Sequence, residues 1–152
     1  MEYVTENAQE TKKLGKKIGN YIKGRADVLK KGAFVVALCG DLGSGKTTFT
    51  KGVAKSLGVK RRIISPTFIL IRRYVCGGGV ESFYHIDLYR IEGKIKNQLR
   101  EIGFDEILKS KRSVVLVEWA DKGKSIFPKD TVWVKFEYIS ENTRKIKITG
   151  LM

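Results

Sequence analysis

The sequence is short of the features that mark several classes of protein. It has two cysteines, Cys39 and Cys76, and neither belongs to a C-x-x-C pair, so a cysteine metal site and a disulfide framework are not expected. No apolar run approaches the length that crosses a membrane, and the N-terminus lacks the apolar segment of a signal peptide. Two well-separated prolines and the absence of low-complexity segments argue against disorder. These absences predict a folded, cytoplasmic protein without membrane contact.

Acidic residues are also scarce relative to basic ones. The chain has 30 Lys and Arg against 16 Asp and Glu, a formal net charge of +14. Such a charge predicts attraction to nucleic acid or to an acidic partner, although a lysine-rich solvated surface explains it equally well. The basic residues are spread along the chain, so they locate no site by themselves. The length of 152 residues, 42% of them hydrophobic, predicts a single domain over residues 1–152.

The strongest motif follows an apolar run at residues 33–39. The next residues are Gly40-Asp41-Leu42-Gly43-Ser44-Gly45-Lys46-Thr47-Thr48, which fit G-x-x-x-x-G-K-[ST] between an expected strand and an expected helix at 46–57. Glycines let such a loop close around phosphate, and the N-terminus of the helix favours an anion. Lys46 would neutralise phosphate oxygens, and the Thr47 hydroxyl would bind Mg²⁺. A glycine-rich turn without a ligand is the plainer alternative.

A second apolar run, at residues 113–117, ends in the carboxylate of Glu118. The pattern of a buried strand followed by an acid is typical of a Walker B element, whose carboxylate reaches Mg²⁺. The pattern is common, but the phosphate-loop motif earlier in the chain supports its interpretation as a Walker B element. We therefore expect this strand to lie beside the phosphate-loop strand and Glu118 to be a metal-site acid.

Two β-prone segments, residues 68–75 and 82–89, flank three consecutive glycines and predict a hairpin. On a strand, His85, Asp87 and Tyr89 share one face, which would form a polar wall of the site. Asp87 could orient a water molecule or take a proton. A single histidine is more often a structural hydrogen-bonding residue than part of a site, and Arg90 is compatible with either phosphoryl-charge stabilisation or a pair with Asp87.

The remaining segments complete an α/β pattern. We expect an edge strand at residues 2–5, a helix at 8–23 capped by Asn7 and Glu10, and a polar segment at 27–32 that ends in a turn at 30–32. Short helices are expected at 95–102 and 104–109, a loop with one helical turn at 121–128, and a hairpin of residues 131–139 and 144–151. Ser65 and Thr67 flank Pro66 in a segment that either returns to the γ-phosphate or forms an ordinary turn. The predicted fold is a P-loop NTPase-like three-layer sandwich with a mostly parallel central sheet and antiparallel hairpin extensions.

These residues predict a nucleoside triphosphatase or phosphotransferase that uses Mg²⁺, with Lys46, Asp87 and Glu118 as its catalytic groups. ATP is favoured because the sequence lacks the N-K-x-D element of guanine-specific enzymes. A small-molecule P-loop kinase is an alternative, although it would need an acceptor pocket and an arginine-bearing lid. A basic nucleic-acid-binding module with a regulatory nucleotide site is a third.

Four motifs together resemble one family. In chain order they are residues 40–48, Ser65-Pro66-Thr67-Phe68, His85-Ile86-Asp87-Leu88-Tyr89-Arg90 and Val117-Glu118-Trp119. With these motifs the chain is similar to the TsaE (YjeE) family from about residue 11 to 128. The resemblance implies a cytoplasmic ATPase that is weak alone and acts with the proteins TsaB and TsaD. It also implies a supporting role in the transfer of threonylcarbamoyl to adenosine 37 of tRNAs that read codons beginning with A.

The resemblance also implies roles for individual residues. Thr47 and Glu118 would hold Mg²⁺, Asp87 would be a catalytic or γ-phosphate-sensing acid, and residues 65–67 would form a switch-like loop. ATP would be bound by Thr11 near the adenine and by the loop residues Gly40, Asp41, Leu42, Gly43, Ser44, Gly45, Lys46, Thr47 and Thr48. Trp119 would contact the nucleotide or a partner. Ala120 stands where the family often has proline, which leaves the path of the chain after Trp119 open.

Overall fold

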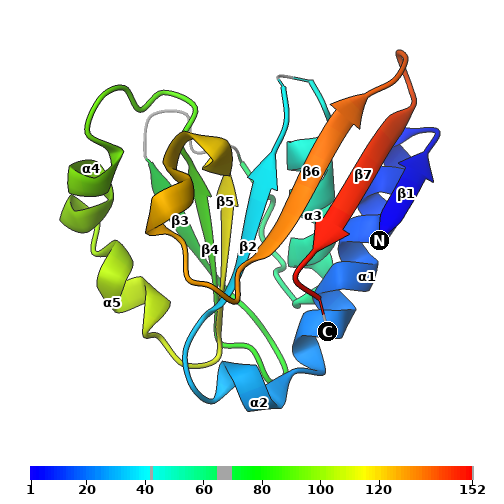
Figure 1. Cartoon of the computed structure of the whole chain (residues 1–152). Coiled ribbons are helices and arrows are strands. Elements are labelled where there is room, and N and C mark those ends of the chain that lie inside the picture. Colours follow the sequence, from blue (N-terminus) through cyan, green and yellow to red (C-terminus); the bar gives the residue numbers. More distant parts are fainter. Residues whose placement is uncertain (42, 65–69, 152) are drawn as a thin grey trace.

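The computed structural model describes residues 1–41, 43–64 and 70–151 (Figure 1). In this part of the chain seven strands form one sheet in the order β1-β7-β6-β2-β5-β4-β3. Its central strand is β2 (Phe34–Cys39), which runs parallel to β5 (Ser113–Glu118) on one side and to β6 (Val132–Tyr138) on the other. The phosphate-loop strand and the strand that ends in Glu118 are therefore neighbours, as the sequence predicts.

The outer strands extend the parallel centre. β4 (Ser82–Asp87) is parallel to β5, and β3 (Ile71–Val75) pairs antiparallel with β4 at one edge. At the other edge β7 (Arg144–Thr149) is antiparallel to β6, and β1 (Glu2–Thr5) is antiparallel to β7. Both predicted hairpins and the predicted edge strand are confirmed.

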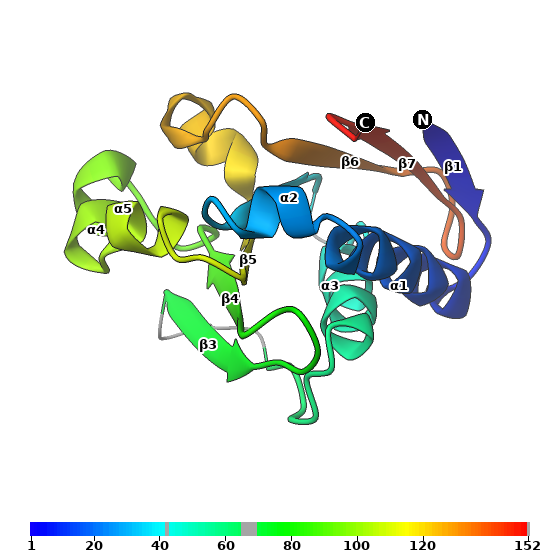
Figure 2. The same cartoon turned by 90° about the horizontal axis from the view of Figure 1, so that it is seen from below.

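Helices cover the two faces of the sheet and give the three-layer architecture (Figure 2). One face packs against α1 (Ala8–Lys23) and α3 (Lys46–Ser56) through a core that includes Ile18, Phe49 and Leu116. The other face packs against α4 (Ile95–Glu101), α5 (Phe104–Leu108) and the 3₁₀ helix η1 (Ala120–Ile126). The apolar runs of β2 and β5 fit this arrangement, because strands covered on both sides are buried almost throughout.

At two points helices α1 and α3 approach each other so closely that only glycine fits. A Cβ atom on Gly15 would lie 2.2 Å from the carbonyl oxygen of Phe49, and one on Gly52 would lie 2.1 Å from the carbonyl oxygen of Lys12. Neither position tolerates a side chain without moving the helices apart. The N-terminal part of α1, with Thr11, is thereby held against the start of α3.

Some boundaries differ from those expected. β4 ends at Asp87, so Tyr89 does not share a strand face with His85 and Asp87 as predicted; Tyr89 lies in the turn that follows. A short helix that was not expected, α2 (Ala26–Leu29), begins just before the polar segment 27–32, and the turn predicted at residues 30–32 follows it. Residues 65–67, expected to form a switch-like loop, lie outside the described residues. No helix in the described ranges has the length and apolarity needed to cross a membrane.

Candidate nucleotide-binding site

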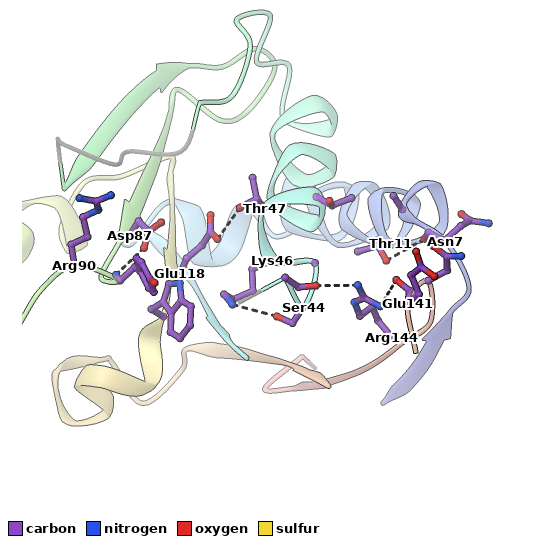
Figure 3. A pocket seen from close by; sticks show the side chains of 17 residues that line it. Asn7, Thr11, Ser44, Lys46, Thr47, Asp87, Arg90, Glu118, Glu141 and Arg144 are labelled. Atoms are coloured by element: carbon purple, nitrogen blue, oxygen red, sulfur yellow. Dashed lines mark hydrogen bonds between the residues drawn. The ribbon is translucent and has the colours of Figure 1, made fainter. Parts of the chain in front are cut away.

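A pocket of about 440 Å³ opens at the carboxyl ends of the parallel strands. Figure 3 shows Asp87 and Glu118 at one end, Thr11 and Arg144 at the other, and Lys46 between them. Ligands bind at this edge of open α/β sheets, because the loops that follow the strands meet there. The described residues that line the pocket are Asn7, Ala8, Thr11, Gly43, Ser44, Gly45, Lys46, Thr47, Thr48, Asp87, Tyr89, Arg90, Glu118, Trp119, Glu141, Asn142 and Arg144.

The loop from β2 to α3 depends on glycine at two positions. Gly40 has φ +147°, and a Cβ atom there would lie 2.8 Å from the carbonyl oxygen of Phe136. Gly45 has φ +102° and is the N-cap residue of α3, so the first turn of the helix begins at the pocket. The unpaired N–H groups of a first turn and the positive end of the helix dipole favour an anion.

Lys46 is 5% exposed and lies inside the loop. Its Nζ donates hydrogen bonds to the carbonyl oxygens of Gly40 at 2.6 Å and Asp41 at 2.8 Å, and to Ser44 Oγ at 3.3 Å. The ammonium also lies 4.1 Å from the ring centre of Trp119, within the range of a cation–π contact. Burial lowers the pKa of Lys46, while Glu118 is the strongest of the nearby carboxylates that oppose this shift.

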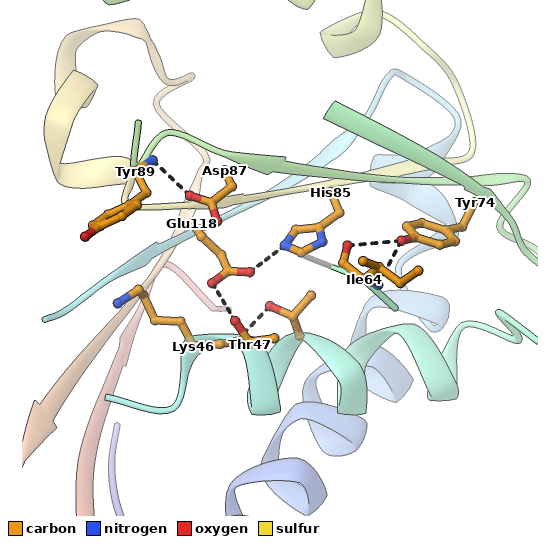
Figure 4. Close-up of polar contacts among 9 residues, drawn as sticks. Lys46, Thr47, Ile64, Tyr74, His85, Asp87, Tyr89 and Glu118 are labelled. Carbon is orange, nitrogen blue, oxygen red and sulfur yellow. Dashed lines mark hydrogen bonds and ion pairs between the residues drawn. The ribbon is translucent and has the colours of Figure 1, made fainter. Parts of the chain in front are cut away.

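Glu118 connects the phosphate loop to β4 through two hydrogen bonds (Figure 4). Thr47 Oγ1 donates to Glu118 Oε1 at 3.2 Å, and His85 Nε2 shares a hydrogen bond of 2.5 Å with Glu118 Oε2. Glu118 is 2% exposed and His85 is fully buried. A carboxylate held at both oxygens in a buried site has a fixed orientation, and here it is directed at the threonine of the motif.

The second carboxylate lies next to the first. Asp87 and Glu118 are partners in the parallel register of β4 and β5. Asp87 Oδ1 accepts a hydrogen bond of 2.9 Å from the backbone N–H of Tyr89, which lowers the pKa of Asp87, but burial has the larger effect and raises it. The Tyr89 and Trp119 rings, with centres 4.9 Å apart, complete the wall of the pocket beside this acid.

The donor atoms at this end suit Mg²⁺. Thr47 and Glu118 offer oxygen atoms, which this ion prefers, and in nucleotide sites Mg²⁺ usually takes one or two carboxylates plus phosphate oxygens. Among the described residues no group of three or more His, Cys, Asp and Glu side chains could hold a metal ion by itself. Thr47 and Glu118 are thus the described residues here whose oxygen atoms could serve as ligands of such an ion.

The other end of the pocket is built by α1 and the β6–β7 turn. Thr11 is 2% exposed, and its hydroxyl is 2.7 Å from Thr5 Oγ1. Asn7 caps α1 by accepting a hydrogen bond of 2.8 Å from the backbone N–H of Glu10, as predicted. The sequence-predicted nucleotide contact Thr11 therefore lies in the same pocket as the phosphate loop.

Arg144 is a site residue that the sequence analysis missed. Its Nη2 donates to the carbonyl oxygen of Gly43 at 3.0 Å, so β7 is tied to the phosphate loop. Its Nη1 donates to the carbonyl oxygens of Ser140 at 2.7 Å and Thr143 at 3.0 Å, which orders the β6–β7 turn. The guanidinium also lies 4.6 Å from the ring centre of Tyr138. No local motif marks this arginine, because its partner is 101 positions away.

Most of the predicted site residues converge on this pocket, while others lie behind it or outside the description. Gly40 and Asp41 contribute at its base through the carbonyl oxygens that hold Lys46. His85 lies behind Glu118 and does not line the pocket. Arg90 and Trp119 lie on its walls. Leu42, a predicted nucleotide-binding residue, lies outside the described residues.

Comparison with known proteins gives the family. The model of the family described as "Threonylcarbamoyl adenosine biosynthesis protein TsaE" matches residues 5–146. The chain belongs to the TsaE family. The TsaE protein of Bacillus subtilis (strain 168) is 36% identical over 151 residues, which cover 99% of this chain and 86% of that protein. The TsaE proteins of Aquifex aeolicus and Treponema pallidum are 34% and 32% identical, over 97% of this chain in both cases and 94% and 99% of theirs.

The crystal structure of a similar protein confirms the fold. The crystal structure of Bacillus subtilis YdiB has a TM-score of 0.71 and 31% identity to this chain, and the match covers 97% of this chain and 83% of that one. The α/β architecture predicted from the sequence is therefore confirmed, and so is the predicted relationship to the TsaE family. The related proteins are named for tRNA threonylcarbamoyladenosine biosynthesis.

Proposed function

We propose that the protein binds ATP with Mg²⁺ in this pocket and hydrolyses it in support of tRNA threonylcarbamoyladenosine synthesis. The observation that carries the proposal is the buried chain from Thr47 through Glu118 to His85, at the mouth of a complete phosphate-loop motif. The hydrogen bond between Thr47 and Glu118 supports the proposal, because these two residues would share the ion. Membership of the TsaE family supplies the pathway.

Lys46 and the first turn of α3 would bind the phosphates. A bound β-phosphate would compete with the carbonyl oxygens of Gly40 and Asp41 for the Lys46 ammonium, exchanging neutral acceptors for an anion. Mg²⁺, when bound, supplies positive charge that stabilises the transferred phosphoryl group. Thr47 and Glu118 are the residues of this chain that would hold it.

Asp87 is positioned to act on the attacking water. It lies beside Glu118 in the register of the two strands and lines the pocket. A carboxylate whose pKa is raised by burial accepts a proton more readily than an exposed one. We propose that Asp87 orients the water, while Glu118 is committed to Thr47 and the ion.

The partners proposed are the TsaB and TsaD proteins, with TsaD as the subunit that transfers threonylcarbamoyl to adenosine 37 of the tRNA. The ATPase supports turnover of that assembly rather than forming the carbamoyl bond.

The test is ATP hydrolysis by the purified chain, alone and with both partner proteins. We expect slow hydrolysis that rises when TsaB and TsaD are added together, and no rise with Lys46→Ala. Unchanged turnover in the presence of both partners would contradict the proposal. ATP labelled at its γ-phosphate distinguishes hydrolysis from a kinase reaction. A kinase would transfer the label to a metabolite, whereas an ATPase releases it as inorganic phosphate.

A further inference from the structure

The net charge of the chain comes entirely from two segments. Residues 11–26 and 42–80 contain 14 of the 30 basic residues and none of the 16 acidic ones. The rest of the chain has 16 of each and is neutral. The basic residues are spread along the whole sequence. The uneven distribution of charge therefore comes from the acidic residues, which are absent from these two segments.

The fold brings these two segments together. Residues 11–26 form most of α1, and residues 42–80 include α3 and β3. The two helices are in backbone contact through Gly15 and Gly52. Figure 2 shows α3 and β3 on the side of the molecule away from β6 and β7.

The lysines of the two helices are close enough to repel one another. Lys55 of α3 has the largest effect in lowering the pKa of Lys16 on α1, and Lys12 and Lys13 lower it further. In the described part of the chain none of these four lysines forms an ion pair. Unpaired like charges destabilise a folded protein, and an anion that binds among them relieves the repulsion.

A hollow lined by arginines lies beyond the end of α3. Its volume is about 240 Å³, and its charged lining consists of Arg61, Arg62, Arg72 and Arg73. Arg72 Nε is buried and has no hydrogen-bond partner among the described residues. Arg73 follows Arg72 on β3, so their side chains leave opposite faces of the sheet, and Arg73 Nε already donates to Ser82 Oγ at 2.9 Å. Guanidinium groups bind phosphate in a bidentate manner, so Arg61, Arg62 and Arg72 are suited to a phosphodiester backbone.

We propose that α1, α3 and the arginine hollow form one binding surface for the phosphate backbone of RNA. We call it the basic surface and define it by Lys12, Lys13, Lys16, Lys51, Lys55, Arg61, Arg62 and Arg72. The choice of tRNA as the RNA to test rests on the proposed function. The surface itself rests on the placement of charge.

Its composition favours RNA over an acidic protein. Protein interfaces are enriched in aromatic residues and depleted of lysine, whereas nucleic-acid interfaces are polar and strongly positive. Of the large hydrophobic residues exposed in the described chain, only Ile64 and Val75 belong to the two acid-free segments. An acidic protein would find many charges here and little apolar surface to bury.

The experiment measures binding of a labelled, unmodified tRNA transcript by fluorescence anisotropy between about 50 and 200 mM salt, the range over which phosphate contacts weaken steeply. The test variant carries K51Q, K55Q, R61Q and R62Q, all exposed positions outside the nucleotide pocket. The matched control carries K94Q, K96Q, K109Q and K111Q, also exposed but on the side of α4 and α5. Both variants lose four positive charges.

We expect the test variant to lose at least about tenfold in tRNA affinity, and the slope of log affinity against log salt to fall by about two to three. The control should stay within about threefold of the unmodified chain. Equal losses in the two variants, or no tRNA binding by the unmodified chain near physiological salt, would overturn the proposal. So would polyglutamate or anionic lipid vesicles binding as tightly as tRNA at the same salt.

A second measurement keeps this inference separate from the proposed function. Binding of a fluorescent ATP analogue should be the same in the unmodified chain and in the test variant, because none of the four substituted residues lines the nucleotide pocket. Loss of tRNA binding with normal nucleotide binding supports the basic surface. Failure of nucleotide binding in every protein, with tRNA binding retained, would remove the proposed function and leave the basic surface in place.

Discussion

The two ends of the nucleotide pocket are built in different ways. At the strand end, which we define by His85, Asp87 and Glu118, the side chains come from adjacent parallel strands, and His85 and Glu118 are almost fully buried. At the hairpin end, defined by Asn7, Thr11 and Arg144, the groups come from a helix terminus and a turn, and the arginine is held by backbone carbonyls. A rigid end suits chemistry and metal geometry, while the hairpin end suits binding. Substitutions at the strand end should therefore affect turnover, and those at the hairpin end should affect affinity.

The largest effect is expected from Glu118→Gln. The amide keeps the size of the side chain but removes the charge that Mg²⁺ would require, so magnesium-dependent turnover should fall about a hundredfold to a thousandfold. ATP hydrolysis over a magnesium titration measures this, and circular dichroism shows whether the fold is kept. Unchanged turnover would reassign the metal-site acid, with Asp87 the next residue to test.

Lys46→Ala tests the group between the two ends. Loss of the ammonium should weaken the affinity for ATP about a hundredfold, because the principal positive side chain of the loop is removed. Calorimetric titration with ATP gives the value. An affinity equal to that of the unmodified chain would show that the triphosphate does not bind in this loop.

His85→Gln tests whether the strand end depends on the second hydrogen bond of Glu118. The histidine lies behind the pocket, so its loss should raise the magnesium concentration needed for half-maximal activity about tenfold to a hundredfold, with little change in ATP affinity. A purely structural role predicts a lower melting temperature and an unchanged magnesium requirement. Measuring both quantities on the same protein separates the two roles.

Arg144→Met tests the hairpin end. Loss of the bond to Gly43 and of those that order the turn should reduce ATP affinity about fivefold, in line with about 1 kcal/mol for a hydrogen bond. The rate at saturating ATP should change little, since the carboxylates are untouched. Lys147→Met on the same strand is the control, because that side chain is exposed and does not line the pocket. A large fall in the saturated rate would mean that the two ends are not separable.

Thr11→Val should have the smallest effect on the site. The substitution keeps the shape of the side chain and removes the hydroxyl that bonds Thr5, which should cost about 1 kcal/mol of unfolding free energy. ATP affinity should stay within about threefold if the hydroxyl is structural. Chemical denaturation and a nucleotide titration measure the two quantities, and a much larger loss of affinity would show that Thr11 contacts the base directly.

Much of the fold could be predicted because it depends on local sequence patterns. The apolar runs at β2 and β5 determine two buried parallel strands, and the motif between β2 and α3 determines the loop. The capping pair Asn7 and Glu10 determines where α1 begins. Each of these features depends on residues that are near one another in the chain.

The features that escaped prediction depend on register and on long-range contacts. His85 meets Glu118 because β4 and β5 align in one register, and no local pattern specifies that alignment. Arg144 reaches Gly43 only after the β6–β7 hairpin has folded over the loop. The β-prone pattern continues through Tyr89 and predicts a strand there, but β4 ends two residues earlier. The acid-free segments can be found in the sequence, but only the contact between α1 and α3 shows that the two segments lie together in the fold.

The backbone contact between α1 and α3 has a mechanical consequence. A side chain at Gly15 or Gly52 would clash with the backbone of the other helix, so the two backbones lie in direct contact at these points. If the first turn of α3 moves when the proposed nucleotide binds, α1 would move with it, together with Lys12, Lys13 and Lys16. The contact between the helices would then link the candidate nucleotide pocket to the basic surface proposed above.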